Sequence, residues 1–222
     1  MVVLATKVYV QGEARRRAMD SLGSIVANQL GELEVTTDVG LRHDDFPSVT
    51  VEGPDATVAR SVLETEWGAI VPDLVEGETY IGTLEAWDTD GWTLDAGREV
   101  RIPVAELGLG PGDATQIVER FGIVQHQRLA FTWGDPPRLA DDERDQLFEW
   151  QRGTDRVTVN SVTRAEAKRG VDRSGHARDI LGIDRLGLLE QQIVCAPETD
   201  GPGLLAALGP RLPGQMRCIV TG

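Results

Sequence analysis

The chain has 222 residues, enough for one large domain or two to three small ones. Acidic residues outnumber basic ones by 36 to 22, the formal net charge is −14, and 41% of the residues are hydrophobic. These values exclude a chain too polar to bury a core, and the longest apolar runs are too short for a membrane-spanning helix. The N-terminus lacks the pattern of a signal peptide, so we expect a cytoplasmic protein with no membrane partner.

Only two of the 22 basic residues are lysines, Lys7 and Lys168. A surface rich in Asp and Glu and poor in Lys stays hydrated in molar salt, where the Debye length falls to about 3 Å and net charge costs little repulsion. The composition is typical of a salt-in halophilic archaeon. The alternative is an ordinary acidic cytosolic protein from a GC-rich genome, which would also favour Arg over Lys.

The two cysteines, Cys195 and Cys218, each fall in a predicted strand, and we expect two reduced thiols. Two Cys and three scattered His cannot build a four-ligand zinc site, so no metal site is expected. We interpret His43-Asp44-Asp45 as a solvated acidic loop.

The first 70 residues predict a small α/β unit. Runs rich in β-branched residues indicate strands over 2–10, 34–41 and 48–52, and apolar spacing predicts helices over 12–30 and 56–67. Gly53-Pro54-Asp55 is typical of a turn, with Asp55 expected to cap the second helix. Helices on one face of a small sheet form such a unit.

Residues 71–138 have short strands separated by turn signals. Strands are predicted over 78–86, 92–95, 99–102 and 128–133, with a short helix over 114–121. Asp90-Gly91 is a strong hairpin dipeptide. The pattern favours a closed or nearly closed small β-barrel. We expect its core to include Ile81, Leu84, Leu94, Ile102, Val104, Leu129 and Phe131.

Two runs in this segment, Gly-Glu-Thr-Tyr-Ile-Gly-Thr-Leu at 77–84 and Val-Arg-Ile-Pro-Val-Ala-Glu-Leu-Gly at 100–108, carry a resemblance to a known barrel. The segment resembles an S1-type OB barrel. RNA-binding members place aromatic and basic residues on the binding face, whereas this segment has only five Arg against 12 acidic residues.

Residues 139–222 begin with an acidic helix over 141–150. Strands over 156–162, 181–185, 189–195 and 215–220 and helices over 163–173 and 202–212 follow. The β-α-β-β-α-β order indicates a ferredoxin-like unit. The run Asp-Gly-Pro-Gly-Leu-Leu at 200–205 is similar to a turn of small-molecule-sensing ACT domains, which share that topology. Pro136-Pro137 is the clearest linker, so we expect an α+β chain divided as 1–70, 71–138 and 139–222.

Over its whole length the chain carries further runs that resemble a family. They include Arg-Gly-Thr-Asp-Arg-Val at 152–157, Gly-His-Ala-Arg-Asp-Ile at 175–180 and Leu-Gly-Leu-Leu-Glu at 186–190. The chain resembles an archaeal family of uncharacterised proteins, domain-of-unknown-function family 2110. The resemblance implies an archaeal, cytoplasmic protein and no particular activity.

Residues 152–185 hold eight basic residues against five acidic ones. Arg suits bidentate binding of phosphate, so this basic island is a candidate site for an anion or nucleic acid. Thr163 and Glu166 form a capping-box pattern at the start of the predicted helix. Alternatively, the bases pair internally with nearby acids. The candidate residues are Arg156, Arg164, Lys168, Arg169, Arg173, His176 and Arg178.

Three hypotheses follow. The first is a non-enzymatic accessory factor that binds RNA or a ribonucleoprotein, supported by fold-level analogy and the basic island. The second is a small-molecule-sensing regulatory module that uses the turn at 200–205. The third is an enzyme centred on His176, Arg178 and Asp179, although the sequence places no Ser, Cys or second His beside them. We expect no cofactor.

Overall fold

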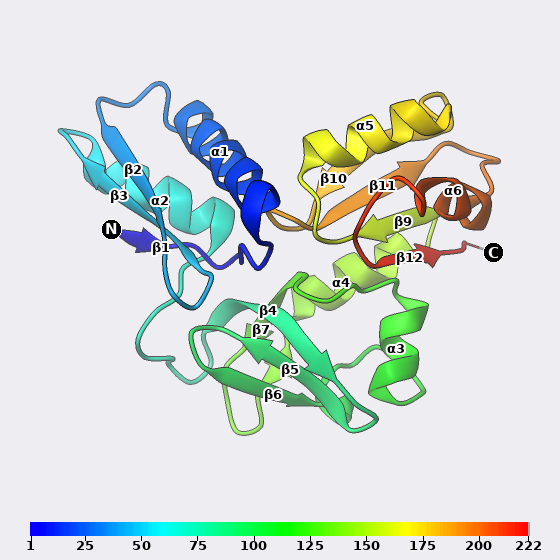
Figure 1. The fold of residues 1–222 in the computed structure, drawn as a ribbon. Coiled ribbons are helices and arrows are strands. Elements are labelled where there is room, and N and C mark those ends of the chain that lie inside the picture. The colour runs from blue at the N-terminus through cyan, green and yellow to red at the C-terminus, as the bar shows by residue number, and fades with distance from the viewer. Residues whose placement is uncertain (222) are drawn as a thin grey trace.

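Three sheets and six α-helices make up residues 1–221 in the computed structural model, which describes that range. Each sheet contributes to its own hydrophobic core. The N-terminal unit (blue to cyan) and the C-terminal unit (yellow to red) lie beside each other, and the central unit (green) lies below both (Figure 1). The chain is therefore a mixed α+β protein. None of the helices in this range is long and apolar enough to cross a bilayer.

The N-terminal unit comprises β1 (Val2–Val3), α1 (Gly12–Gln29), β2 (Thr36–Leu41), β3 (Pro47–Glu52) and α2 (Ala56–Trp67). Its sheet is antiparallel, in the order β1-β3-β2. Both helices bury one face in the core of this unit. The Asp55 side chain makes no bond to α2, contrary to our expectation, because it accepts a hydrogen bond from the Glu34 backbone N–H at 2.8 Å.

The first strand is much shorter than the predicted run over 2–10. After β1 the segment stays buried, but tertiary contacts satisfy its polar groups instead of a sheet ladder. The Val8 N–H donates to the Asp45 carbonyl at 2.8 Å, and the Leu188 N–H donates to Thr6 Oγ1 at 3.1 Å. The apolar run therefore marks a buried segment, and in sequence a buried segment outside a sheet has the same pattern as a β-strand.

The central unit contains β4 (Thr79–Trp87), β5 (Gly91–Asp95), β6 (Glu99–Pro103), a 3₁₀ turn η1 (Val104–Glu106), α3 (Ala114–Arg120), β7 (Arg128–Thr132) and β8 (Arg138–Leu139). The five strands form an antiparallel sheet in the order β6-β5-β4-β7-β8. The sheet curls into a half-barrel, and its edge strands β6 and β8 approach each other without pairing. The expected core is confirmed for Leu84, Leu94, Ile102, Leu129 and Phe131, which are fully buried, while Ile81 and Val104 are partly buried.

Helix α4 (Asp141–Trp150) belongs with the central unit by its packing. Its buried Leu147 and Trp150 lie in the central core, and the Ala130 N–H of β7 donates to Glu143 Oε2 at 2.8 Å. The sequence-based division places this acidic helix with residues 139–222 instead. The apolar side of the helix covers the curled sheet, a long-range contact that the proline linker at 136–137 does not reveal.

The C-terminal unit comprises β9 (Arg156–Val159), α5 (Arg164–Ser174), β10 (Ile180–Arg185), β11 (Gln191–Cys195), α6 (Gly201–Leu208) and β12 (Met216–Ile219). The element order is the expected one, and the antiparallel sheet has the order β10-β11-β9-β12. Helices α5 and α6 pack against it over a core that includes Val157 and Val159. Cys195 and Cys218 are free thiols, and β9 lies between their strands.

The turn between β10 and β11 joins the units. We call residues 186–190 the junction turn. Its Leu188 and Leu189 are buried in the core of the N-terminal unit, not in the C-terminal sheet. The Tyr9 hydroxyl donates to Glu190 Oε1 at 2.6 Å and accepts from the Ser161 N–H at 2.9 Å, while its ring stacks on His126 of the central unit at 3.8 Å. Residues from all three units thus meet around Tyr9.

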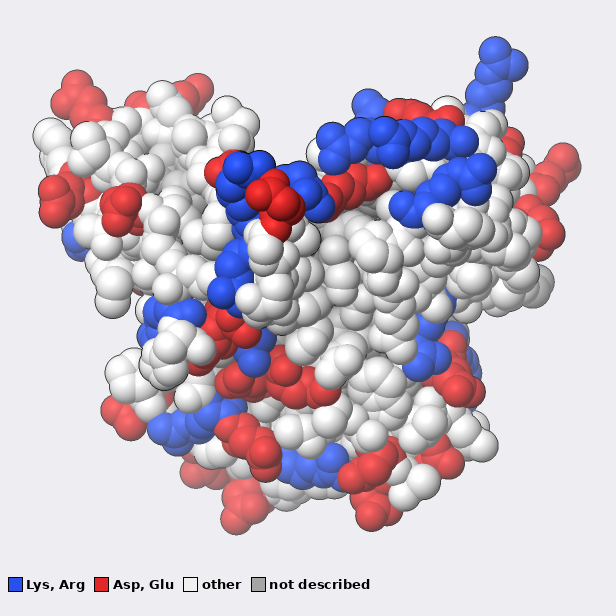
Figure 2. All heavy atoms as spheres, in the orientation of Figure 1, with Lys and Arg blue, Asp and Glu red and all other residues white. Residues whose placement is uncertain are grey.

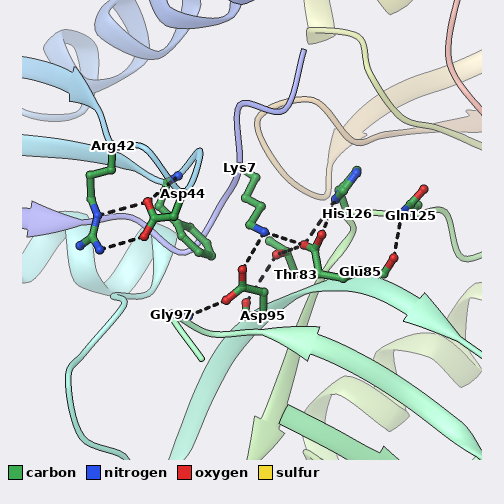
Figure 3. Close-up of polar contacts among 10 residues, drawn as sticks. Lys7, Arg42, Asp44, Thr83, Glu85, Asp95, Gly97, Gln125 and His126 are labelled. Carbon is green, nitrogen blue, oxygen red and sulfur yellow. Dashed lines mark hydrogen bonds and ion pairs between the residues drawn. The ribbon is translucent and has the colours of Figure 1, made fainter. Parts of the chain in front are cut away.

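An ionic cluster also ties the N-terminal unit to the central sheet (Figure 3). Lys7 Nζ lies 2.7 Å from Asp95 Oδ2 and 3.1 Å from Glu85 Oε1, with its pKa raised above the usual value because these two carboxylates outweigh the effect of burial. Burial of Glu85 acts against ionisation, but hydrogen bonds from His126 and Thr83 lower its pKa to about 2. One of the two lysines in the chain therefore has a structural role.

Candidate anion-binding face

Helix α5 carries most of the basic island, and local signals fix its ends. The Glu166 N–H donates to Thr163 Oγ1 at 3.3 Å, and the Thr163 N–H donates to Glu166 Oε2 at 2.9 Å, which confirms the predicted capping box. Gly175 ends the helix in the left-handed conformation, with φ 84°. Ala167, Gly170 and Val171 face the core, so the long basic side chains point outward.

The bases of α5 are exposed and unpaired. Within residues 1–221, none of them forms an ion pair with a carboxylate. The chain nonetheless carries 36 acidic residues, some of them on the same helix. Lys and Arg atoms gather over α5 and over the neighbouring end of α1 (Figure 2). The internal-pairing alternative therefore fails for Arg164, Lys168, Arg169 and Arg173, which we call the α5 face.

One side of the α5 face borders a groove of about 400 Å³ between α5 and the segment that follows α6. Arg169 and Arg173 line it together with Arg17 from α1 and Arg211. The single carboxylate in the lining is Glu166, which lies 2.8 Å from Arg17 Nε. Four arginines therefore face one acidic group, an arrangement that favours an anion.

The other side of the α5 face lies over β10. Arg164, Lys168 and Asp172 line a second hollow of about 250 Å³, floored by apolar residues that include Ile180 and Ile183. Gly170 allows the close packing of the helix, because a Cβ there would lie 2.7 Å from Leu212 Cδ2. The basic side chains of α5 therefore border two separate hollows, one on each side of the helix.

The remaining candidates lie elsewhere. Arg156 is on β9 beside Val157, which faces the α5 core, so its side chain is on the opposite side of the sheet. It donates to Gln192 Oε1 at 2.7 Å and lies 3.7 Å from Asp184. His176 Nδ1 is paired with Asp179 Oδ2 at 2.7 Å. Arg178 is exposed, with no ion pair in the described chain.

His176 and Asp179 line a hollow of about 460 Å³ at the start of α6. Its other polar groups are Glu198, Thr199 and Asp200, and the Thr199 hydroxyl donates to the Asp179 carbonyl at 3.1 Å. The lining contains no Ser, Cys or Lys side chain. A nucleophile of those types is therefore missing beside the His–Asp pair.

The aromatic residues of the barrel segment are buried or partly buried. Trp92, Phe121 and Phe131 are fully buried, and Tyr80, Trp87 and Trp133 are partly buried against the same core. An exposed stacking platform for bases needs aromatic faces open to solvent. None of these six side chains is fully exposed, so the half-barrel presents at most partly open aromatic faces in residues 71–138.

Sequence reasoning missed two of the groove's arginines. Arg17 belongs to an Arg-Arg-Arg run that is typical of a solvated helix face, and its partner Glu166 lies 149 residues away. Arg211 follows α6 and donates to the Ala207 carbonyl at 2.6 Å, like an ordinary helix-end arginine. No local pattern identifies either as part of a shared groove.

Comparison with known protein families matched almost the whole chain. The DUF2110 N-terminal domain matches residues 1–73, the DUF2110 central domain residues 74–151 and the DUF2110 C-terminal domain residues 154–220. The boundary at 151 agrees with the packing of α4 on the central unit. A comparison with curated proteins found no match.

Proposed function

The chain is a member of the DUF2110 family, and because that membership names no activity, we propose from the geometry of the α5 face that it is a non-enzymatic, RNA-binding accessory factor. The observation that carries this proposal is the set of three groove arginines, Arg169, Arg173 and Arg211, that have no carboxylate partner in the described chain. In a protein with net charge −14, a cluster of exposed basic groups without carboxylate partners can attract an anionic partner from outside the chain.

An RNA backbone fits this groove better than a single small anion. Arg169 and Arg173 are separated by one helical turn, about 6 Å along the axis, so they can contact neighbouring phosphates. Arg17 and Arg211 extend the row beyond α5. A guanidinium group can donate two parallel hydrogen bonds to two oxygens of one phosphate. These bidentate hydrogen bonds still contribute to binding when salt screens the attraction between charges.

We interpret the C-terminal unit as ferredoxin-like and the central unit as OB-like, two fold types that often bind nucleic acids. In this chain the surface left open for nucleic acid differs from the sheet face that such folds usually offer. Ile219 of β12 packs into the central core, and the Asn160 side chain donates to the Gln125 carbonyl at 3.0 Å. The sheet face opposite α5 is therefore covered, and the proposed RNA lies on the helical side. We place the protein in the cytoplasm of a halophilic archaeon on its composition.

Fluorescence anisotropy with a labelled single-stranded RNA tests the proposal, at 0.2 M and 2 M KCl. We expect the Arg169→Ala, Arg173→Ala double variant to bind at least tenfold more weakly. The plot of log affinity against log salt concentration should become shallower by about one unit of slope for each phosphate that the variant no longer neutralises. Stability should change little, since an exposed charge contributes at most about 1 kcal/mol.

The matched control is Arg152→Ala, which removes an exposed arginine outside the groove, paired with Glu149 at 2.6 Å. It should bind RNA within twofold of the parent chain. Equal losses in both variants, or no RNA binding at all, would refute the proposal. Competition by poly-glutamate as strong as that by RNA would instead identify an acidic protein as the partner.

A small-molecule-sensing module is the second candidate, because the hollow at the start of α6 lies at the ACT-like turn 200–205. Its polar lining has three carboxylates, Asp179, Glu198 and Asp200, against His176, so it favours a ligand with a cationic group. Thermal shift with a panel of amino acids tests this function. A rise in melting temperature that Asp200→Asn abolishes would support the sensing function. The absence of a shift with every amino acid tested would rule that function out.

A further inference from the structure

A second polar cavity lies away from the α5 face, where the junction turn meets the central unit. It has a volume of about 190 Å³. Its walls come mainly from β7, α4 and the end of β10. The residues that line it include Arg128, Glu143, Gln146, Trp150 and Arg185. We call it the junction cavity.

Two arginines border this cavity without a carboxylate partner. Arg128 Nε is buried with no hydrogen-bond acceptor, and Nη2 has only the Glu66 carbonyl at 3.4 Å. Arg185 is exposed and forms no ion pair in residues 1–221. The two guanidinium groups lie 5.6 Å and 5.9 Å from the ring centre of Trp67. Both cations lie against the same aromatic ring, and neither has a carboxylate at ion-pair distance in the described residues.

The carboxyl groups near Arg128 are in surroundings that favour their neutral form. Burial raises the pKa of Glu143 to about 7 and that of Glu190 to about 8, although Arg128 acts in the opposite direction. Glu190 Oε2 is buried with no hydrogen-bond partner. Neither carboxyl lies within ion-pair distance of Arg128. When both are protonated, the positive charge of the two arginines is not cancelled.

We propose that the junction cavity binds a small oxyanion, a sulfate-like, phosphate or carboxylate group, held by Arg128 and Arg185 with the Gln146 amide as a further donor. The volume is large enough to admit one such group. Gln146 makes no hydrogen bond within the described residues, so its amide is free to donate. No residue of the α5 face lines this cavity, although burial and the nearby Arg164 of that face lower the pKa of Arg185.

Isothermal titration calorimetry with inorganic sulfate at constant ionic strength tests the site. Sulfate keeps its charge between pH 6 and 8.5, so any pH dependence belongs to the protein. The charged groups that act on Arg128 are Glu190, Glu143, Glu66 and Arg185. Since Glu143 and Glu190 lose their protons over this range, the dissociation constant should be at least tenfold lower at pH 6 than at pH 8.5.

Glu143→Gln is the decisive variant, because it should strengthen binding and cannot do so by unfolding the protein. Its amide oxygen can still accept from the Ala130 N–H. Affinity at pH 8.5 should rise at least threefold, and the pH dependence should shrink. Arg185→Gln, at an exposed position, should weaken binding at least tenfold, whereas Arg16→Gln, an exposed arginine paired with Glu13 at 2.5 Å, should have no effect.

Acetate in a parallel titration separates the ligand classes. Binding of acetate as tight as that of sulfate identifies a carboxylate site, and a clear preference for sulfate identifies a tetrahedral one. The proposal is wrong if Arg185→Gln and Arg16→Gln bind alike, or if Glu143→Gln does not strengthen binding at pH 8.5. Loss of RNA binding in the α5-face variant with sulfate binding unchanged would show that the two sites are independent.

Discussion

Gly187→Ala is a sharp test of how the junction turn holds the units together. Gly187 is buried, and a Cβ added there would overlap Glu190 Oε2 and lie 3.2 Å from the carboxyl carbon of the same residue. The backbone at this position is outside the left-handed region, so alanine adds no backbone strain. The cost therefore comes only from displacing the Glu190 carboxyl group.

The size of the effect follows from what that displacement breaks. Glu190 is fully buried, so its carboxyl group cannot move into solvent, and it would lose the 2.6 Å bond from Tyr9. Overpacking costs about 1–3 kcal/mol, and a lost buried hydrogen bond adds about 1 kcal/mol or more. We expect a loss of roughly 2–4 kcal/mol, or about 4–16 °C in melting temperature for a chain of this size.

Gly182→Ala is the matched control, because it makes the same change in β10 where nothing lies within 4 Å of the new methyl group. Calorimetry and urea unfolding followed by tryptophan fluorescence should show it within about 1 kcal/mol of the parent chain. In a Glu190→Ala background, the cost of Gly187→Ala should nearly vanish because the overlap is gone. The reasoning fails if Gly187→Ala is as stable as the control, or if its cost is the same in both backgrounds.

Three further predictions concern stability. The melting temperature should rise between about 0.1 M and 2 M KCl as salt screens repulsion among the acids, and a flat or falling curve in thermal scans would count against a halophilic protein. Glu85→Gln should cost about 1–2 kcal/mol at pH 7, discounted for partial exposure. The pKa of Glu85 is lowered to about 2, so its contribution is present above about pH 4.3 and lost as the pH falls toward 2, and urea unfolding across that range should show the two proteins converge. Leu188→Ala should cost about 2–5 kcal/mol by opening the N-terminal core, and a loss below 1 kcal/mol would mean that the junction turn is not an integral part of it.

Features fixed by neighbouring residues were predictable from the sequence. The bounds of α2 and α4, the capping box of α5 and the hairpin after Asp88 all depend on residues within one or two turns of chain. The exposed bases of α5 also follow from helical spacing around Ala167 and Val171.

Features built between distant segments were not predictable in this way. The predicted strand over 189–195 begins at Leu189, and Leu188 comes directly before it. An apolar pair beside β11 has the same sequence pattern whether it enters its own sheet or another core. Glu190 falls within the same predicted strand, and no local pattern indicates that it is fully buried against Tyr9, 181 residues away in the chain. Position in the fold, and not residue type, gives these side chains their roles.

The junction turn also bears on how the protein is made. Synthesis proceeds from the N-terminus, and early parts of a chain often fold before later parts leave the ribosome. Here the N-terminal core includes Leu188 and Leu189, so it is incomplete until more than four fifths of the chain has been translated. The sequence divides at 73 and 151 into three family segments, but the first needs the last to finish its interior. A nascent chain or a truncated gene product that ends before the turn would expose that apolar surface, which makes it a target for chaperones and proteases.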